Sequence, residues 1–173
     1  MKIYLAGPDV FRPRPLEHFM MLKELCTKHG HQGISPFDNE TDFEGTPLSK
    51  EHSIKIFQSN VETVKICDVV FANLENFRGA CIDDGTAWEL GCGFAYQKLL
   101  YGYTEYHNVK LKTITEAIHS YEYIEQRHIY PSVESFSDNC VNLMIQESIE
   151  ISGGKILRKF EDCLVDLNEK YVK

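Results

Sequence analysis

Residues 67–91 read CDVVFANLENFRGACIDDGTAWELG, and this stretch decides the fold class. Residues 68–74 form a Val-rich apolar run, as expected for a strand buried on both faces. A loop follows, and the pattern then predicts a helix from Gly85 to Gln97. A buried strand that leads through a loop into a helix indicates an α/β protein, whose ligands bind beyond the carboxyl ends of the strands.

The same alternation of strands and helices continues on both sides of this unit. Further strands are expected at Ile3–Ala6, Ile34–Phe37, Leu99–Tyr103 and Ile149–Ile151, and further helices at Pro15–His29, Ser49–Lys65, Thr113–Tyr121 and Lys155–Val172. Residues 38–48 are polar and contain Gly45 and Pro47, which predicts a surface loop. The order predicts a doubly wound, flavodoxin-like (Rossmann-like) parallel five-stranded sheet with helices on both faces.

Length and charge limit the classes of function. With 173 residues, 43% of them hydrophobic, the chain can form one core, and we expect a single domain over residues 1–173. A net charge of −8 without a local basic stripe argues against binding a nucleic-acid polymer. The densest basic group, Lys155, Arg158 and Lys159, fits a solvated helix face.

Cysteine usage and the N-terminus indicate a cytoplasmic protein. The six cysteines form no CxxC pair and have no His at zinc-ligand spacing, so we expect buried thiols and no metal. The chain enters a strand-like run at Ile3 instead of a signal peptide, and no apolar stretch reaches membrane-spanning length. No association with a membrane is therefore expected.

The turn before the predicted helix at Gly85 carries the candidate chemistry. Gly85 permits a tight turn, and Thr86 places a hydroxyl among the unpaired amides of the first helical turn. Glu89 lies one turn further on the same face, where it could point toward a ligand of the loop. Alternatively, Asp83, Asp84 and Glu89 only complement the helix dipole, with Asp84 facing solvent.

The neighbours of Glu89 argue against a purely structural role. Trp88 and Leu90 suggest that the helix packs into a core, and Gly91 and Gly93 would allow another element to approach closely. A carboxylate on such a helix is unlikely to be incidental.

Four stretches together resemble one enzyme family. Residues 83–91, DDGTAWELG, are similar to the D-x-G-[ST]-x-x-E-[LIV]-G signature of nucleoside 2-deoxyribosyltransferases. Residues 3–8 resemble the family's first strand and loop, the segment from Asn60 to Leu74 resembles its N-x-x-x-I-x-x-C-D-x-V-x-A-x-L element, and residues 142–144 match its late N-L-M element. The order and spacing make accidental agreement improbable.

The resemblance implies exchange of the base on a 2′-deoxynucleoside. Glu89 would attack the anomeric carbon and hold the sugar covalently until a second base attacks, so that two inversions give net retention. Asp83 would protonate or hydrogen-bond the departing base, although it could instead cap the helix. Tyr4, at the carboxyl end of the first strand, would orient Glu89, although a buried strand tyrosine is the plainer interpretation.

Substrate contacts implied by the resemblance come from several segments. Gly7, Phe11, Arg78 and Gly85 would line the site together with Asn60, which stands where several relatives carry Asp and which cannot act as a general acid. Asn142 and Met144 would complete the site of a neighbouring subunit in a dimer or a trimer of dimers. Phe11, Phe37 and Phe77 could sandwich the base, or could be plain packing.

Three functions remain open from the residues. Transfer between nucleosides and free bases is favoured. Hydrolysis, as in deoxynucleoside 5′-monophosphate N-glycosidases, needs a phosphate pocket, which Arg12, Arg14 and Arg78 could supply. A non-catalytic nucleotide-binding module would use the same crevice and would not need Glu89. No G-x-G-x-x-G motif follows the first strand and no P-loop is present, so no cofactor is expected.

Overall fold

The sheet is parallel and has five strands. The computed structural model describes residues 1–39, 49–118 and 138–172. Its strands are β1 (Lys2–Ala6), β2 (Gln32–Ile34), β3 (Val69–Asn73), β4 (Leu99–Tyr103) and β5 (Ile156–Leu157). They lie in the order β2-β1-β3-β4-β5, and each neighbouring pair is parallel. This confirms the predicted flavodoxin-like α/β fold.

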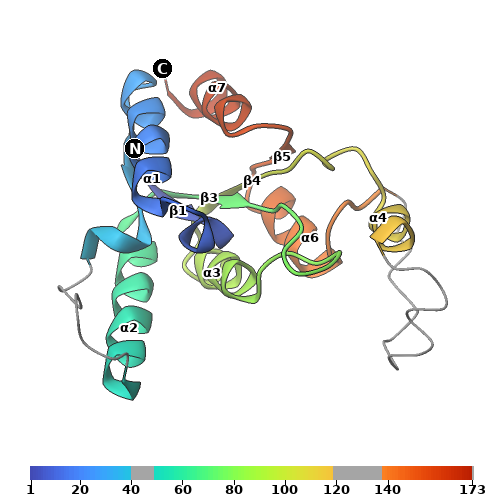
Figure 1. Ribbon diagram of the computed structural model, residues 1–173. Helices are drawn as coiled ribbons and strands as arrows, with labels where there is room; N and C mark the ends of the chain where they lie inside the picture. The colour runs from blue at the N-terminus through green and yellow to red at the C-terminus, as the bar shows by residue number, and fades with distance from the viewer. Residues whose placement is uncertain (40–48, 119–137, 173) are drawn as a thin grey trace.

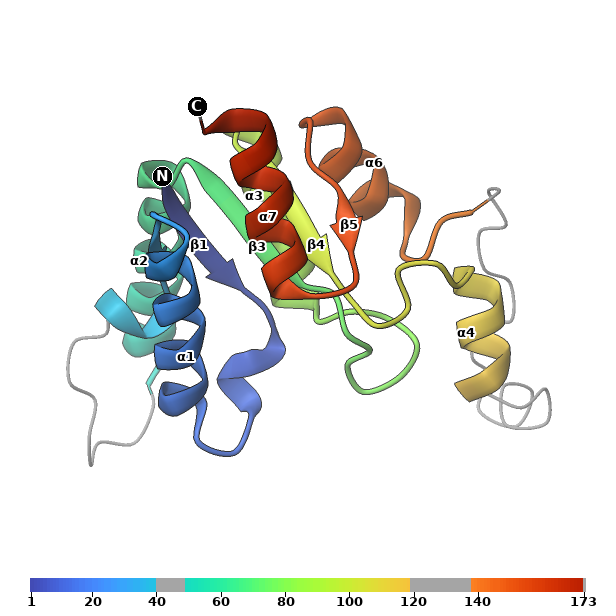
Figure 2. The same cartoon turned by 90° about the horizontal axis from the view of Figure 1, so that it is seen from above.

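Helices cover both faces of the sheet, as Figures 1 and 2 show. The helices are α1 (Pro15–Lys28), α2 (Lys50–Ile66), α3 (Asp84–Ala95), α4 (Leu111–Ile118), α6 (Leu143–Ile151) and α7 (Phe160–Tyr171), with 3-10 turns η1 (Pro8–Phe11) and η2 (Pro36–Asn39). Buried residues of α1 and α7 share one core cluster, and those of α2, α3 and α6 share the other. None of the described helices is both long and apolar enough to cross a membrane.

Alternation along β1 directs Tyr4 toward the face covered by α3. Ile3 and Leu5 belong to the cluster with α1 and α7, whereas Tyr4 and Ala6 belong to the cluster with α2, α3 and α6. Tyr4 pairs in register with Val70 of β3, and both are fully buried. The phenol is therefore held by the sheet on the side where α3 packs.

Two predicted strands were placed wrongly. β2 ends at Ile34, because Pro36 opens η2 and cannot donate a backbone hydrogen bond to a strand. Residues Ile149–Ile151 form the last turn of α6, and the final strand is β5. The predicted helix at Lys155–Val172 accordingly begins only at Phe160. Residues 40–48 of the predicted surface loop, and the part of the predicted Thr113–Tyr121 helix beyond residue 118, lie outside the described residues.

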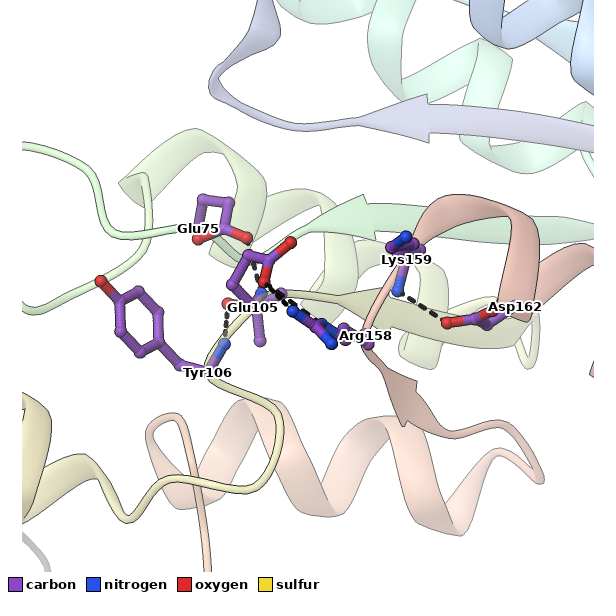
Figure 3. Close-up of polar contacts among 7 residues, drawn as sticks. Glu75, Glu105, Tyr106, Arg158, Lys159 and Asp162 are labelled. Atoms are coloured by element: carbon purple, nitrogen blue, oxygen red, sulfur yellow. Dashed lines mark hydrogen bonds and ion pairs between the residues drawn. The ribbon is translucent and has the colours of Figure 1, made fainter.

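The basic group of Lys155, Arg158 and Lys159 flanks β5 and does not line a helix face. Figure 3 shows Arg158 and Lys159 of this group. Arg158 donates from Nε and Nη2 to Glu105 Oε2 at 3.2 and 2.9 Å, and Lys155 pairs with Asp166 at 2.6 Å. Glu105 is fixed in turn, because its backbone N–H donates to Glu75 Oε1 at 2.7 Å. These contacts join the carboxyl ends of β3, β4 and β5 and balance the charges of Lys155 and Arg158.

The six cysteines are free thiols. Cys26, Cys67, Cys140 and Cys163 are buried, and Cys92 is partly buried. Cys81, in the loop before α3, is exposed, contrary to the expectation of a buried thiol.

Candidate active site

Asp83 caps α3 at the carboxyl edge of the sheet. Its Oδ2 accepts hydrogen bonds from the backbone N–H of Thr86 at 2.9 Å and from the Thr86 hydroxyl at 3.1 Å. A Cβ on Gly85 would lie 3.0 Å from the same oxygen, so glycine leaves room for the cap. Asp83 therefore caps the helix, and this contact leaves its proposed role at the departing base untested; Asp84 is exposed as expected. Oδ1 of Asp83 takes part in neither bond.

Glu89 meets Tyr4 in the space between α3 and the sheet. The Tyr4 hydroxyl donates to Glu89 Oε1 at 2.5 Å, across 85 positions of sequence. Tyr4 lies in the middle of β1, not at its carboxyl end. Because Tyr4 is fully buried, its hydroxyl holds Oε1 of this carboxylate in a fixed position.

Burial sets the electrostatics of this pair. It raises the pKa of Glu89 to about 7, the Tyr4 hydrogen bond opposes the rise, and the charge of Asp83 adds to it. The pKa of Tyr4 is raised well above its usual value, first by burial and then by the charge of Glu89. Tyr4 therefore stays a hydrogen-bond donor, while Glu89 changes between acid and carboxylate near neutral pH.

The neighbours of Glu89 divide into two groups. Leu90 is buried, and a Cβ on Gly93 would lie 2.9 Å from Leu100 Cδ2, so α3 does pack closely on the sheet. Trp88 is 47% exposed and contacts the Phe57 ring of α2 at a tilt of 59°, and a Cβ on Gly91 would meet open space. The expected packing of the helix into a core is therefore provided by Leu90 and Gly93, and among the described residues no other element approaches Gly91 closely.

A buried carboxylate that the sequence argument missed lies beyond β1. Asp9 is 1% exposed; its Oδ2 accepts from Asn73 Nδ2 at 2.9 Å, and its Oδ1 from Arg12 Nη1 at 3.2 Å. His18 Nε2 lies 3.1 Å from the same Oδ1. Gly7 is required beside this group, since its φ is 154° and a Cβ would lie 2.7 Å from Asn73 Cβ. Asn73 ends β3, whereas Asp9 lies in η1 beyond β1, so no local sequence pattern links the two residues.

Two of the three expected aromatic residues lie together. Phe11 and Phe77 stack on each other with centroids 5.3 Å apart and planes at 22°. The Arg78 guanidinium lies 5.5 Å from the Phe11 ring centre and 4.6 Å from that of Phe77. The two rings contact each other and leave no slot between them in this structure, which corresponds to the packing alternative. Phe37 packs instead against Phe19 in the core.

Asn142 and Met144 lie at the start of α6. Asn142 is the N-cap, and its Oδ1 accepts from the backbone N–H of Met144 at 2.9 Å. The Met144 side chain is 73% exposed, on the rim of a groove of about 620 Å³ between α3 and α6. The groove is lined mainly by apolar residues such as Phe94 and Ile151. Asn60 is partly buried on α2.

Residues 1–39, 49–118 and 138–172 contain no group of three or more His, Cys, Asp or Glu side chains arranged to hold a metal ion. The described site is therefore one of carboxylates, a phenol and aromatic rings.

Comparison with known proteins identifies the family. A family model described as nucleoside 2-deoxyribosyltransferase matches residues 3–145. The chain belongs to this family. The matched range contains Tyr4, Asp83, Glu89 and Asn142, which confirms the resemblance carried by the four sequence stretches.

Solved structures share the fold. A 2-desoxiribosyltransferase from Leishmania mexicana has a TM-score of 0.73 at 24% identity, covering 98% of each chain. A conserved protein from Enterococcus faecalis V583 has a TM-score of 0.65 at 21% identity, also covering 98% of each chain. A 2-deoxyribosyltransferase from Bacillus psychrosaccharolyticus has a TM-score of 0.51 at 29% identity, over 69% of this chain and 83% of that one.

A curated relative from Schizosaccharomyces pombe, described as an uncharacterized protein, is 42% identical over 103 residues. The match takes in 59% of this chain and 49% of the relative, so it spans about half the relative's length.

Proposed function

We propose that this chain transfers 2-deoxyribose between nucleobases through a covalent deoxyribosyl–Glu89 intermediate. Family membership supports the reaction class. The observation that carries the choice of nucleophile is the hydrogen bond from the Tyr4 hydroxyl to Glu89 Oε1. It fixes a carboxylate on the first turns of a helix at the edge of the sheet where α/β proteins bind ligands.

The first displacement forms the intermediate. Glu89 Oε2 attacks the anomeric carbon of the nucleoside, the C–N bond breaks, and its electron pair leaves with the base nitrogen. In the second displacement a nitrogen of another base attacks the same carbon and gives its proton to Asp83, and the C–O bond to Glu89 breaks. The electron pair returns to the carboxylate, so the configuration is retained.

Asp83 faces the leaving group in this proposal. Its Oδ2 is held by Thr86, so Oδ1 is the atom that would hydrogen-bond or protonate the departing base. The cap and the catalytic role therefore use different oxygens of one carboxyl group. Capping also fixes the side chain at the start of the helix that carries Glu89.

The contacts of the arginines favour a nucleoside over a nucleotide. Arg12 pairs with Asp9 at 3.2 Å, and Arg14 pairs with Glu17 at 3.1 Å. The Arg78 guanidinium lies over the two phenylalanine rings. A phosphate would have to compete with each of these contacts, which argues against the 5′-monophosphate N-glycosidase alternative.

We also propose that the active form is a homo-oligomer in which Asn142 and Met144 complete a neighbour's site. The support is the exposed apolar groove between α3 and α6, with Phe94 43%, Met144 73% and Ile151 70% exposed. An apolar surface of this kind is typical of protein interfaces. Met144→Glu should give a monomer by light scattering, and an unchanged oligomer would refute this arrangement.

Covalent labelling tests the nucleophile. The wild type is mixed with a deoxynucleoside that carries fluorine at the sugar 2-position, because the fluorine slows hydrolysis of the intermediate. Intact-protein mass spectrometry should then show one deoxyfluororibosyl group on the wild type. Peptide mapping should place it on Glu89. Glu89→Ala should remain unlabelled, whereas Asp84→Asn, which removes an exposed carboxylate from the same helix, should label normally. Labelling at another residue would refute the assignment.

Product analysis tests transfer against hydrolysis. The enzyme is incubated with 2′-deoxyinosine and free adenine, and the products are separated by chromatography. Formation of 2′-deoxyadenosine supports transfer. Release of hypoxanthine with free deoxyribose and no new nucleoside would instead establish the N-glycosidase reaction, and binding without either product would favour the non-catalytic module.

A further inference from the structure

We propose that Asp9 is a positioning residue that holds Phe11 against Phe77 and so builds an aromatic wall on which the nucleobase stacks. This inference rests on the proposed function. It concerns a carboxylate on the connection between β1 and α1, whereas Glu89 lies on α3.

Asp9 joins segments that are distant in sequence. Its carboxylate accepts from Asn73 Nδ2 at the end of β3, from Arg12 in the loop after β1, and lies 3.1 Å from His18 Nε2 on α1. Asn73 is 4% exposed, and its own Oδ1 accepts from the backbone N–H of Glu75 at 3.0 Å. A buried carboxylate with partners on three elements fixes their relative positions, because moving any one leaves a charge without its donors.

The two connections fixed in this way carry the two rings. Phe11 follows Asp9 by two residues, and Phe77 follows Asn73 by four. Phe11 is 61% exposed, so the packing of the core does not hold it, and its stacking on Phe77 depends on the relative position of the loops. Both loops follow parallel neighbouring strands and therefore lie at the carboxyl edge of the sheet, as α3 does at its start (Figure 2).

An exposed ring offers a nucleobase a flat surface. Base–aromatic stacking is strong and tolerant of base identity, since every base has a π face. The Phe11–Phe77 pair is already closed, so a base would stack on the outer face of the pair and would not enter between the rings. Arg78, over both rings, stiffens the same wall.

Substitution of Asp9 by Asn is the direct test. The side chain keeps its size but directs an amide N–H₂ toward groups that are themselves donors. The KM for the deoxynucleoside and for the acceptor base should rise about tenfold, with kcat changed less than about threefold. Asp166→Asn is the matched control, since Asp166, on α7, also accepts from three donors, Tyr101, Lys155 and Lys170. It should lower the melting temperature without raising KM.

A double-mutant cycle separates positioning from general stability. In a Phe11→Ala background, Asp9→Asn should raise KM no further, because the wall is already gone. The exchange variant Asp9→Asn/Asn73→Asp restores a donor–acceptor pair between the two loops and should reverse part of the rise in KM. Multiplicative KM effects with Phe11→Ala, or equal KM changes for Asp9→Asn and Asp166→Asn, would overturn the inference.

Nuclear Overhauser effects between labelled Phe11 and Phe77 rings provide a readout that does not depend on turnover. They should be present in the wild type and in Asp166→Asn, and weak or absent in Asp9→Asn. Unchanged contacts in Asp9→Asn would refute the inference even if the enzyme exchanges bases. A wild type that neither exchanges nor releases bases would refute the proposed function, while the ring contacts would still report whether Asp9 holds the stack.

Discussion

Replacing Tyr4 by Phe should move the acid limb of the pH profile for covalent labelling to higher pH. The substitution removes only the hydroxyl that donates to Glu89 Oε1. A hydrogen bond to a charged group contributes about 1.5–3 kcal/mol, which corresponds to a pKa change of about 1–2 units. The pKa of Glu89, already raised by burial to about 7, should therefore rise to about 8–9 in the variant.

The consequence is a loss of nucleophile at neutral pH. The carboxylate fraction at pH 7 should fall from about one half to between about one tenth and one hundredth, so the labelling rate should drop about 5- to 50-fold. The loss should shrink as the pH rises toward about 9. The assay is the rate of covalent labelling by the 2-fluoro deoxynucleoside, followed by intact mass spectrometry from pH 5 to pH 10 in the wild type and the variant.

Tyr101→Phe is the control. Tyr101 is also fully buried and donates to a carboxylate, Asp166 Oδ2 at 2.7 Å, but on the opposite face of the sheet. Its removal should affect stability and leave the midpoint of the labelling profile unchanged. A Tyr4→Phe profile with the same midpoint as the wild type would refute the reasoning that this hydroxyl keeps Glu89 ionised.

Three further predictions concern stability. Glu89→Gln should raise the free energy of unfolding at pH 8 by about 1–3 kcal/mol and change it little at pH 4. The reason is that the raised pKa of Glu89 makes the wild type lose stability as the pH rises from about 4.5 to 7. Urea titrations at both pH values check this. Asp166→Asn should lower the free energy of unfolding by about 1–2 kcal/mol at pH 7. This difference should fade as the pH falls from about 4 to 2, because the pKa of Asp166 is lowered to about 2 and its stabilising contribution disappears on protonation. Gly93→Ala should cost about 1–3 kcal/mol through contact with Leu100, whereas Gly91→Ala, facing open space on the same helix, should stabilise by up to about 1 kcal/mol; equal melting temperatures for the two glycine variants would contradict the packing described for α3.

The local pattern of apolar residues was enough to predict the elements that are long or fully buried. β1, β3, β4 and α3 were expected within one or two residues of their observed bounds. β5 was missed because it has only two residues, and its pairing depends on Gly154 passing against the Leu100 carbonyl. Ile149, fully buried, and Ile151 flank Glu150, an alternation that fits a strand as well as a helix turn, so only the tertiary packing decides between them.

The candidate site could likewise be predicted only in part from the sequence. The family signature pointed to Glu89, and the family's first strand pointed to Tyr4, which together brought out the observed contact. Asp9 and Asn73 form no local pattern, since they become partners only after β1 and β3 pair in register. The stacking of Phe11 on Phe77 depends on the same pairing, and the sequence predicted aromatic residues at the edge without their closed arrangement.

The contact between Tyr4 and Glu89 also links the chemistry to the integrity of the fold. The phenol belongs to a central strand and the carboxylate to a helix that is docked on the sheet through Gly93. The helix cannot separate from the sheet without breaking this bond and opening the core. On heating, loss of the Tyr4–Glu89 contact is therefore expected to coincide with cooperative unfolding of the whole core, with no earlier stage in which the fold persists and the proposed nucleophile is displaced.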